Sequence, residues 1–95
     1  MYARVVRMRV NPSHIEAVAS EFTLRAAPHL RAVRGFCHSY WMIDGDDRIL
    51  IVSLWDTLEN LQAGEDKTSV IREVALKQMG AAVWSVENLR VLAEY

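Results

Sequence analysis

The most constraining feature of the sequence is a pair of adjoining strands with large apolar residues on both faces. The pair is the stretch GFCHSYWMIDGDDRILIVSLWD, Gly35 to Asp56, in which Gly45 can adopt the positive φ of a tight hairpin turn. The second strand places aliphatic side chains on both of its faces: Ile49, Leu50, Ile51, Val52 and Leu54. A strand in a two-layer protein needs only one apolar face, because solvent covers the other. The second face of this hairpin therefore requires a cover.

Strict alternation assigns the side chains of the first of these strands to two faces. One face holds Phe36, His38, Tyr40 and Met42, and we expect it to contact the helices. The opposite face holds Cys37, Trp41 and Ile43. On this assignment Trp41 anchors a contact with a second molecule, and Cys37 behaves as a small buried hydrophobe.

The composition indicates one folded domain spanning residues 1–95. The chain is 52% hydrophobic and 24% charged, which is ordinary for a globular protein. A net charge of −1 argues against a nucleic-acid or membrane-surface partner, and no apolar run approaches the ~20 residues of a membrane-spanning helix. The opening MYARVVRMRV has arginines throughout and lacks the apolar core of a signal peptide. With one cysteine and no export signal, we expect a cytoplasmic protein.

The N-terminal third predicts a strand followed by a helix. Residues 2–10 alternate between apolar and polar or small side chains, as a half-buried strand does. Asn11 then suits a helix cap and Pro12 the first helical turn. Pro28 should kink or end this helix.

The C-terminal half predicts a second helix and a last strand. Asp56 and Glu59 have the spacing of a capping box, Gly64 is expected to interrupt the helix, and Gly80 to end it. The predicted apolar face of this helix contains Val70, Ile71, Val74, Ala75 and Met79. Residues 84–95 alternate again as a strand.

The resulting order is β-α-β-β-α-β. Short connections and right-handed crossovers convert this order into a ferredoxin-like α+β fold, with a four-stranded antiparallel sheet and both helices on one face. The other face is left bare and apolar, which is unusual for a soluble monomer. The simplest cover is the same face of a second copy, so we expect a homodimer.

Several segments resemble the antibiotic-biosynthesis-monooxygenase-like domains of the dimeric α+β-barrel superfamily. They are the opening strand MYARV, the RGF that enters the second strand, and ILIVSLWDTLENL, in which Trp55, Asp56 and Leu58 follow the family pattern. The resemblance implies dimerisation through the sheet face into an α+β barrel, and a pocket between sheet and helices in each protomer. It also implies, for some members, oxidation of polyphenolic or anthrone-like substrates with O₂ and no bound cofactor.

Other members of that family bind and degrade heme, and the sequence departs from their pattern. Those members use an Asn within strand one, and a Trp and a His in the helix after the strand-three Trp. Here Asn11 is at the end of strand one, Ala63, Gly64 and Val74 stand near the other positions, and no Trp or His occurs between Asp56 and Ala82. Heme degradation is therefore disfavoured, and no cofactor is expected.

His38 and Tyr40 are the candidate catalytic residues. An imidazole titrates near neutral pH, so His38 could remove a phenolic proton and leave an electron-rich anion that reacts with O₂. The phenol of Tyr40 could donate a hydrogen bond to a substrate oxygen. The alternatives are a histidine held at the pocket edge and an amphipathic core aromatic.

The candidate substrate-binding residues are Trp84, Phe22, Met42 and Arg72. Trp84 could stack on a flat aromatic substrate or plug the sheet edge, while Phe22 and Met42 supply apolar wall. Arg72 could steer an anionic substrate, or pair in solvent with Glu73 or Asp66.

No metal site is predicted. His14 and His29 lie fifteen residues apart and have no carboxylate or cysteine partner at ligand spacing. Cys37 is in no CxxC motif.

Three functions remain open from the sequence. The first is a cofactor-independent monooxygenase acting on a small hydrophobic aromatic substrate such as a polyphenol, anthrone or quinol. The second is a non-enzymatic dimeric protein, ligand-binding or stress-related, that uses the same apolar pocket. The third is an isomerase or lyase, which needs only a base and a dry pocket.

Overall fold

The computed structural model describes the backbone of residues 1–95 and the side chains of all residues except a set in the last helix. That set is Thr68, Val70, Ile71, Arg72, Val74, Ala75, Leu76, Gln78 and Met79. The apolar face predicted for the second helix and the candidate residue Arg72 therefore lie outside the described side chains.

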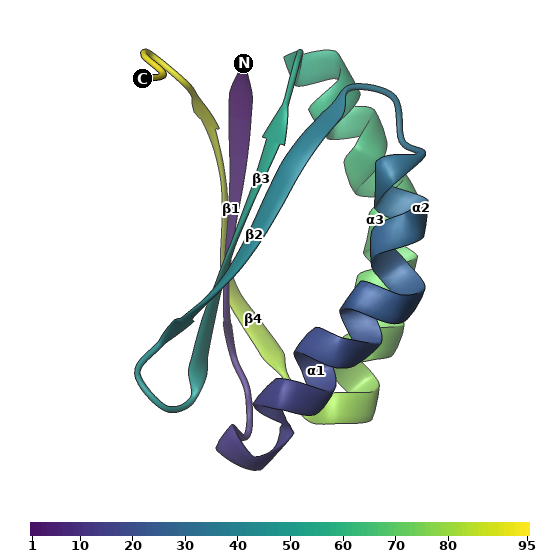
Figure 1. The fold of residues 1–95 in the computed structure, drawn as a ribbon, viewed down its shortest axis with the longest axis vertical. Coiled ribbons are helices and arrows are strands. Elements are labelled where there is room, and N and C mark those ends of the chain that lie inside the picture. Colours follow the sequence, from purple (N-terminus) through teal and green to yellow (C-terminus); the bar gives the residue numbers. More distant parts are fainter.

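The chain forms a four-stranded antiparallel sheet with its helices on one face (Figure 1). The strands are β1 (Tyr2–Arg9), β2 (Phe36–Asp44), β3 (Arg48–Trp55) and β4 (Ala82–Arg90), in the sheet order β2-β3-β1-β4. The helical elements are η1 (Pro12–His14), α1 (Ile15–Glu21), η2 (Phe22–Ala26), α2 (Ala27–Arg31) and α3 (Leu58–Met79). The predicted ferredoxin-like α+β fold is confirmed, although the last strand ends at Arg90 and not at residue 95.

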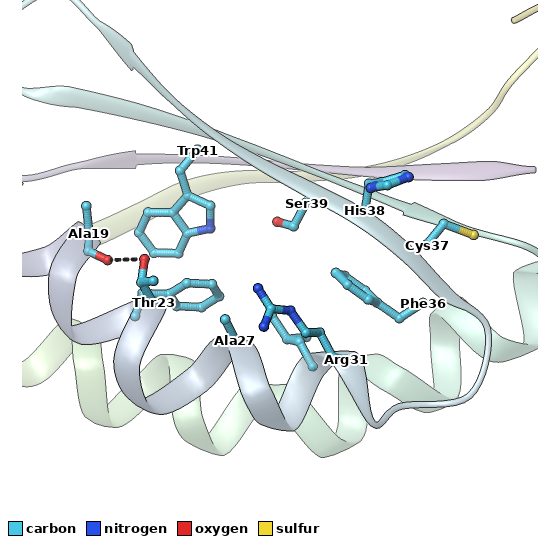
Figure 2. Close-up of a pocket in the computed structure, with 11 residues that line it drawn as sticks. Ala19, Thr23, Ala27, Arg31, Phe36, Cys37, His38, Ser39 and Trp41 are labelled. Carbon is cyan, nitrogen blue, oxygen red and sulfur yellow. Dashed lines mark hydrogen bonds between the residues drawn. The ribbon is translucent and has the colours of Figure 1, made fainter.

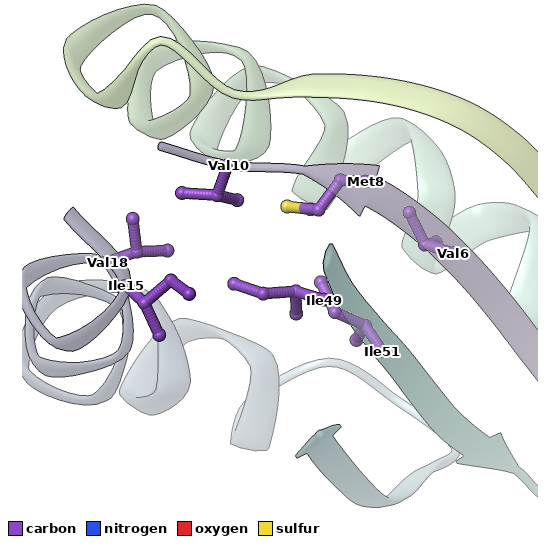
Figure 3. Packing of buried hydrophobic residues seen from close by; sticks show 7 residues of the cluster. All are labelled: Val6, Met8, Val10, Ile15, Val18, Ile49 and Ile51. Carbon is purple, nitrogen blue, oxygen red and sulfur yellow. The ribbon is translucent and has the colours of Figure 1, made fainter. Parts of the chain in front are cut away.

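The core lies between the helices and the helix-facing side of β1 and β3 (Figure 3). Its buried cluster consists of Val6, Met8, Val10, Ile15, Val18, Ile49 and Ile51. Burying one such side chain stabilises the fold by ~1.5–3 kcal/mol. The apolar alternation of residues 2–10 places three members of this cluster, Val6, Met8 and Val10, on one face.

The opposite side of the sheet, which we call the outer sheet face, has no helix over it (Figure 1). Strand register arranges its side chains in three rows across the sheet, from β4 to β2. The rows are Leu89, Ala3, Leu54 and His38, then Glu87, Val5, Val52 and Tyr40, then Ser85, Arg7, Leu50 and Met42. Most of the side chains in these rows are apolar. The polar ones are His38, Arg7, Ser85 and Glu87.

β2 departs from strict alternation at its first residues, and this overturns the predicted faces. Phe36 pairs with Trp55 whereas His38 pairs with Leu54, so Cys37 is an extra residue in a bulge. Phe36 and His38 consequently lie on opposite sides of the sheet. The prediction that His38, Tyr40 and Met42 face the helices is therefore wrong.

Trp41 and Ile43 lie on the helix-facing side of the sheet, contrary to the prediction. Both were predicted to lie away from the helices, but their partners in the register, Ile51 and Ile49, belong to the buried core cluster. Trp41 packs against that cluster, so it is no anchor for an interface on the outer sheet face.

The first helix continues past Pro28 through a π-helical turn. Proline has no backbone N–H, and in a regular α-helix its ring would clash with the carbonyl of Leu24. The π turn over Phe22–Ala26, closed by a hydrogen bond from the Ala27 N–H to the Phe22 carbonyl, absorbs this mismatch. The helix then continues to Arg31, and Asn11 caps its start as predicted.

α3 is continuous, so the predicted interruption at Gly64 is wrong. Its cap is also displaced by one residue, because Thr57 Oγ1, not Asp56, accepts the hydrogen bond from the backbone N–H of Asn60 at 3.1 Å. Asp56 Oδ1 instead accepts from the Thr57 N–H at 2.6 Å and from Asn60 Nδ2 at 2.9 Å. Gly80, with a φ of 61°, ends the helix as predicted.

Candidate functional site

A cavity of about 620 Å³ lies between β2 and the helical segment α1–α2 (Figure 2). Its helical wall is formed by Ala19, Phe22, Thr23, Ala27, Leu30 and Arg31. Its sheet wall is formed by Phe36, Cys37, His38, Ser39 and Trp41. The volume is in the range of small-molecule sites.

A stripe along one side of the helical segment, in which every member except Arg31 is small, creates this space. Ala19, Thr23, Ala27 and Arg31 recur at intervals of four, so they share one side of the helical segment and all line the cavity. Thr23 Oγ1 donates a hydrogen bond to the Ala19 carbonyl at 2.8 Å, which holds its methyl group in place. Short side chains along this stripe leave room between the helix and β2.

Two aromatic rings form one end of the cavity. The Phe22 and Trp41 ring centroids are 4.1 Å apart with an interplanar angle of 39°. Figure 2 shows Trp41 and Ser39 directed from β2 into the cavity, with Phe36 further along the same strand. Phe36 also packs edge-on against Trp55, at 5.5 Å between centroids. The site can therefore hold a flat apolar ligand between aromatic groups.

The indole Nε1 of Trp41 is buried and has no hydrogen-bond partner among the residues that the structure describes. A buried N–H without an acceptor costs ~1–3 kcal/mol, so native proteins rarely leave one unsatisfied. An acceptor oxygen on a ligand in the cavity would remove this cost.

Among the described residues that line the cavity, Arg31 is the charged side chain beside the titratable His38, and none is an aspartate or glutamate. Figure 2 shows its guanidinium extending from α2 toward β2. The cavity therefore combines apolar walls with hydrogen-bond donors and a positive charge, which suits the stabilisation of a negative charge on a ligand oxygen.

The structure brings two of the predicted site residues to the cavity, Phe22 and His38. In Figure 2 the His38 imidazole lies on the far side of β2 from the helices, and its ring stacks with Tyr40 at 6.3 Å between centroids. Tyr40 and Met42 lie on the outer sheet face and do not line the cavity. Trp84 lies at a bulge of β4, 51% exposed, and is not in the lining either.

Sequence reasoning missed Arg31 and Ser39 and gave Trp41 a different place. The spacing of Ala19, Thr23 and Ala27 was the available signal for Arg31, because it continues the same helical stripe. Trp41 could be assigned only after the bulge at Cys37 was known.

Among the described residues, no group of three or more His, Cys, Asp or Glu side chains could hold a metal ion. No helix in that same part of the chain is long and apolar enough to cross a membrane.

Comparison with known proteins places these features in a family. The family model for antibiotic biosynthesis monooxygenases matches residues 1–68. A search of curated protein sequences gives no significant match.

Three solved structures illustrate the likeness in fold. A dimeric ferredoxin-like protein from an uncultured marine organism has a TM-score of 0.76 at 14% identity, covering 100% of this chain and 98% of that one. SnoaB, a cofactor-independent oxygenase from Streptomyces nogalater, has a TM-score of 0.75 at 14% identity, with 98% and 94% covered. The heme-degrader MhuD from Mycobacterium tuberculosis, solved with two hemes in its active site, has a TM-score of 0.72 at 17% identity, with 100% and 99% covered. At these identities the likeness shows a shared fold.

Proposed function

Because this chain belongs to the antibiotic biosynthesis monooxygenase family, we propose that it oxidises a small aromatic substrate with O₂ and without a bound cofactor, in the cavity between β2 and α1–α2. The observation that supports this most directly is the cavity lining, which joins aromatic walls to donors and a cation and has no carboxylate. The fold shared with the cofactor-independent oxygenase SnoaB agrees with the proposal.

Such a reaction needs a substrate that supplies its own electrons. Removal of a proton from a phenol or from the CH₂ of an anthrone leaves an anion, which transfers an electron to O₂. Recombination forms a C–O bond and a hydroperoxide, and loss of water then leaves a carbonyl. For an anthrone, written R₂CH₂, the sum is R₂CH₂ and O₂ giving R₂C=O and H₂O, with four electrons passing from substrate to O₂. For a phenol, a ring C–H becomes the second carbonyl of a quinone with the same loss of water.

The protein's part is to stabilise the anion and to exclude water. The Trp41 N–H and the Arg31 guanidinium are the groups that would contact the anionic oxygen, while Phe22 and Phe36 would hold the ring. Removing one preorganised donor of this kind lowers the rate by about 10²–10³-fold.

His38 borders the cavity on β2, but its imidazole lies on the outer sheet face, on the far side of the strand from the helices (Figure 2). Tyr40 lies on the same face. We therefore make no catalytic proposal for either residue.

O₂ uptake tests the proposed activity. Chelator-treated protein is assayed with a panel of anthrones and hydroquinones, and ¹⁸O₂ should place one labelled atom in the product and one in water. Trp41→Phe keeps an aromatic ring and should lower uptake by about 10²-fold, as for loss of one oxyanion donor. Ligand uptake without any O₂ consumption would contradict the proposal and favour the ligand-binding alternative. Turnover under anaerobic conditions would favour the isomerase or lyase.

We further propose that the outer sheet face pairs with that of a second copy. Large apolar side chains on it are partly open to solvent, among them Tyr40 at 54%, Met42 at 42% and Leu89 at 48%. The marine ferredoxin-like protein of the same fold is described as dimeric, which agrees with such an arrangement. An isologous pairing would cover the apolar rows and leave the cavity on the helical side in each protomer.

A further inference from the structure

We propose that the cavity selects an aromatic ligand that bears a carboxylate, which Arg31 and the Trp41 N–H would bind in the place that the proposed function gives to the anionic substrate oxygen. This inference rests on the proposed function only in placing the substrate in this cavity. It concerns binding, and so it can be tested without turnover.

The first support is the state of the arginines. Arg4, Arg7, Arg9, Arg25 and Arg48 each form an ion pair with a carboxylate. Arg31, Arg34 and Arg90 have no carboxylate within 4.0 Å in the described part of the chain, and of these three Arg31 is the one that lines the cavity. Arg31 therefore lines the cavity with guanidinium donors that no described carboxylate occupies.

The second support is the placement of a further donor facing the same space. The Trp41 Nε1–H is buried without a described partner, and Trp41 and Arg31 come from opposite walls of the cavity (Figure 2). A guanidinium matches the two oxygens of a carboxylate in a planar fork. An indole N–H can bond the same group, because each carboxylate oxygen accepts more than one hydrogen bond.

The third support is the character of the rest of the wall. Phe22, Phe36 and Leu30 surround the space with apolar surface, so the body of the ligand must be apolar, and the tilted Phe22–Trp41 pair favours a flat ring. With no carboxylate in the lining, nothing there repels an anion. An aromatic acid satisfies the charge, the donors and the apolar wall together.

Calorimetric titration of the full chain with 2-naphthoate and with 2-naphthamide tests the selectivity. The two probes share ring and shape but differ in charge. We expect the wild type to bind naphthoate at least about tenfold more tightly, with an affinity that falls as salt rises. Arg31→Gln should remove that preference, because it lowers the affinity for naphthoate far more than that for naphthamide, whose neutral oxygen forms a weaker hydrogen bond with the guanidinium.

Two further variants complete the test. Arg34→Gln is the matched control, since Arg34 is exposed just beyond α2 and does not line the cavity, and it should retain the preference. Trp41→Phe should weaken both probes by about tenfold or less, because both offer an oxygen to the N–H. Equal affinity of the wild type for both probes, or equal effects of Arg31→Gln and Arg34→Gln, would overturn the inference. Equal binding of the two probes by a protein that still consumes O₂ would overturn the inference while leaving the proposed oxygenase intact. Naphthoate selectivity without O₂ uptake would support the inference and contradict the proposed oxygenase.

Discussion

Trp55 occupies the space that a side chain at position 64 would need. It is 2% exposed, and its indole N–H donates to Ser53 Oγ at 3.0 Å. A Cβ built on Gly64 would collide with the six-membered ring of Trp55, at 2.7 Å from Cζ3. The glycine that looked like a helix breaker is therefore a contact point, where α3 approaches the end of β3.

Replacing this glycine should destabilise the protein although alanine is the better helix former. Helix propensity alone would make Gly64→Ala more stable by ~1 kcal/mol, whereas overpacking against Trp55 should cost ~1–3 kcal/mol. Urea unfolding of Gly64→Ala, Trp55→Phe and the double variant gives the coupling free energy between the two positions. The clash predicts that Gly64→Ala costs less in the Trp55→Phe background, and additive effects would contradict it.

The structure perturbs the titration of Asp56. The side-chain hydrogen bond from Asn60 holds the pKa of this carboxyl below its ordinary value of 3.8, and the Thr57 N–H acts in the same direction. The unfolded chain therefore binds the proton more tightly than the folded one. The stabilising contribution is complete above pH ~4 and is lost as the pH falls through the folded pKa.

Asn60→Ala should return the pKa of Asp56 toward its ordinary value. The measurement is a pH titration of the Asp56 carboxyl carbon by NMR, in the wild type and in the variant. Glu59→Ala serves as the control, since no hydrogen bond from Glu59 to Asp56 contributes to the shift. An unchanged Asp56 titration in Asn60→Ala would show that the amide is not the cause.

At the scale of elements, the start of α3 depends on Thr57. Its Oγ1 accepts from the Asn60 N–H, which is one of the orphan donors of the first turn. We expect Thr57→Ala to lower the free energy of unfolding by ~1 kcal/mol, and Thr57→Ser to retain most of it. Glu59→Ala should have little effect, although the sequence predicted Glu59 as half of a capping box. A larger loss for Glu59→Ala than for Thr57→Ala, by urea unfolding, would reverse this assignment.

The elements themselves were predictable because their signals are local. The alternation of β1, the Asn11 cap and the stop at Gly80 follow from neighbouring residues and are confirmed. The faces of β2 were not predictable, since the extra residue at Cys37 is defined only by its pairing with β3. One bulge moves each later side chain of the strand to the other face.

The same non-local effect determined which residues of the site could be predicted from the sequence. Phe22 was predicted from its helical spacing and lines the cavity, whereas Tyr40 and Met42 were carried to the wrong face by the missed bulge. Arg31 was missed because the sequence leaves open whether Pro28 kinks or ends the helix, and the structure shows that the helix continues through Arg31 after the π turn.

At the scale of the whole molecule, the two sides of the sheet have separate roles. The helix-facing side holds the core and the cavity, and the outer sheet face is apolar without a helix to cover it. Association through the outer face would therefore leave the mouth and walls of the cavity intact. Among the described residues the two surfaces share only His38, so variants at other positions should affect binding and assembly independently.

A charge on the outer sheet face should separate the proposed dimer. In Tyr40→Glu a carboxylate replaces a ring in the middle row, beside Val52, and burying it without a partner is strongly unfavourable. Ile43→Glu is the matched control, because it introduces the same charge on the same strand, at a side chain that is 64% exposed and opposite Ile49 on the helix-facing side. Sedimentation velocity should give a dimer for the wild type and for Ile43→Glu, and a monomer for Tyr40→Glu. A monomeric wild type, or equal behaviour of the two variants, would mean that this face does not pair with its copy.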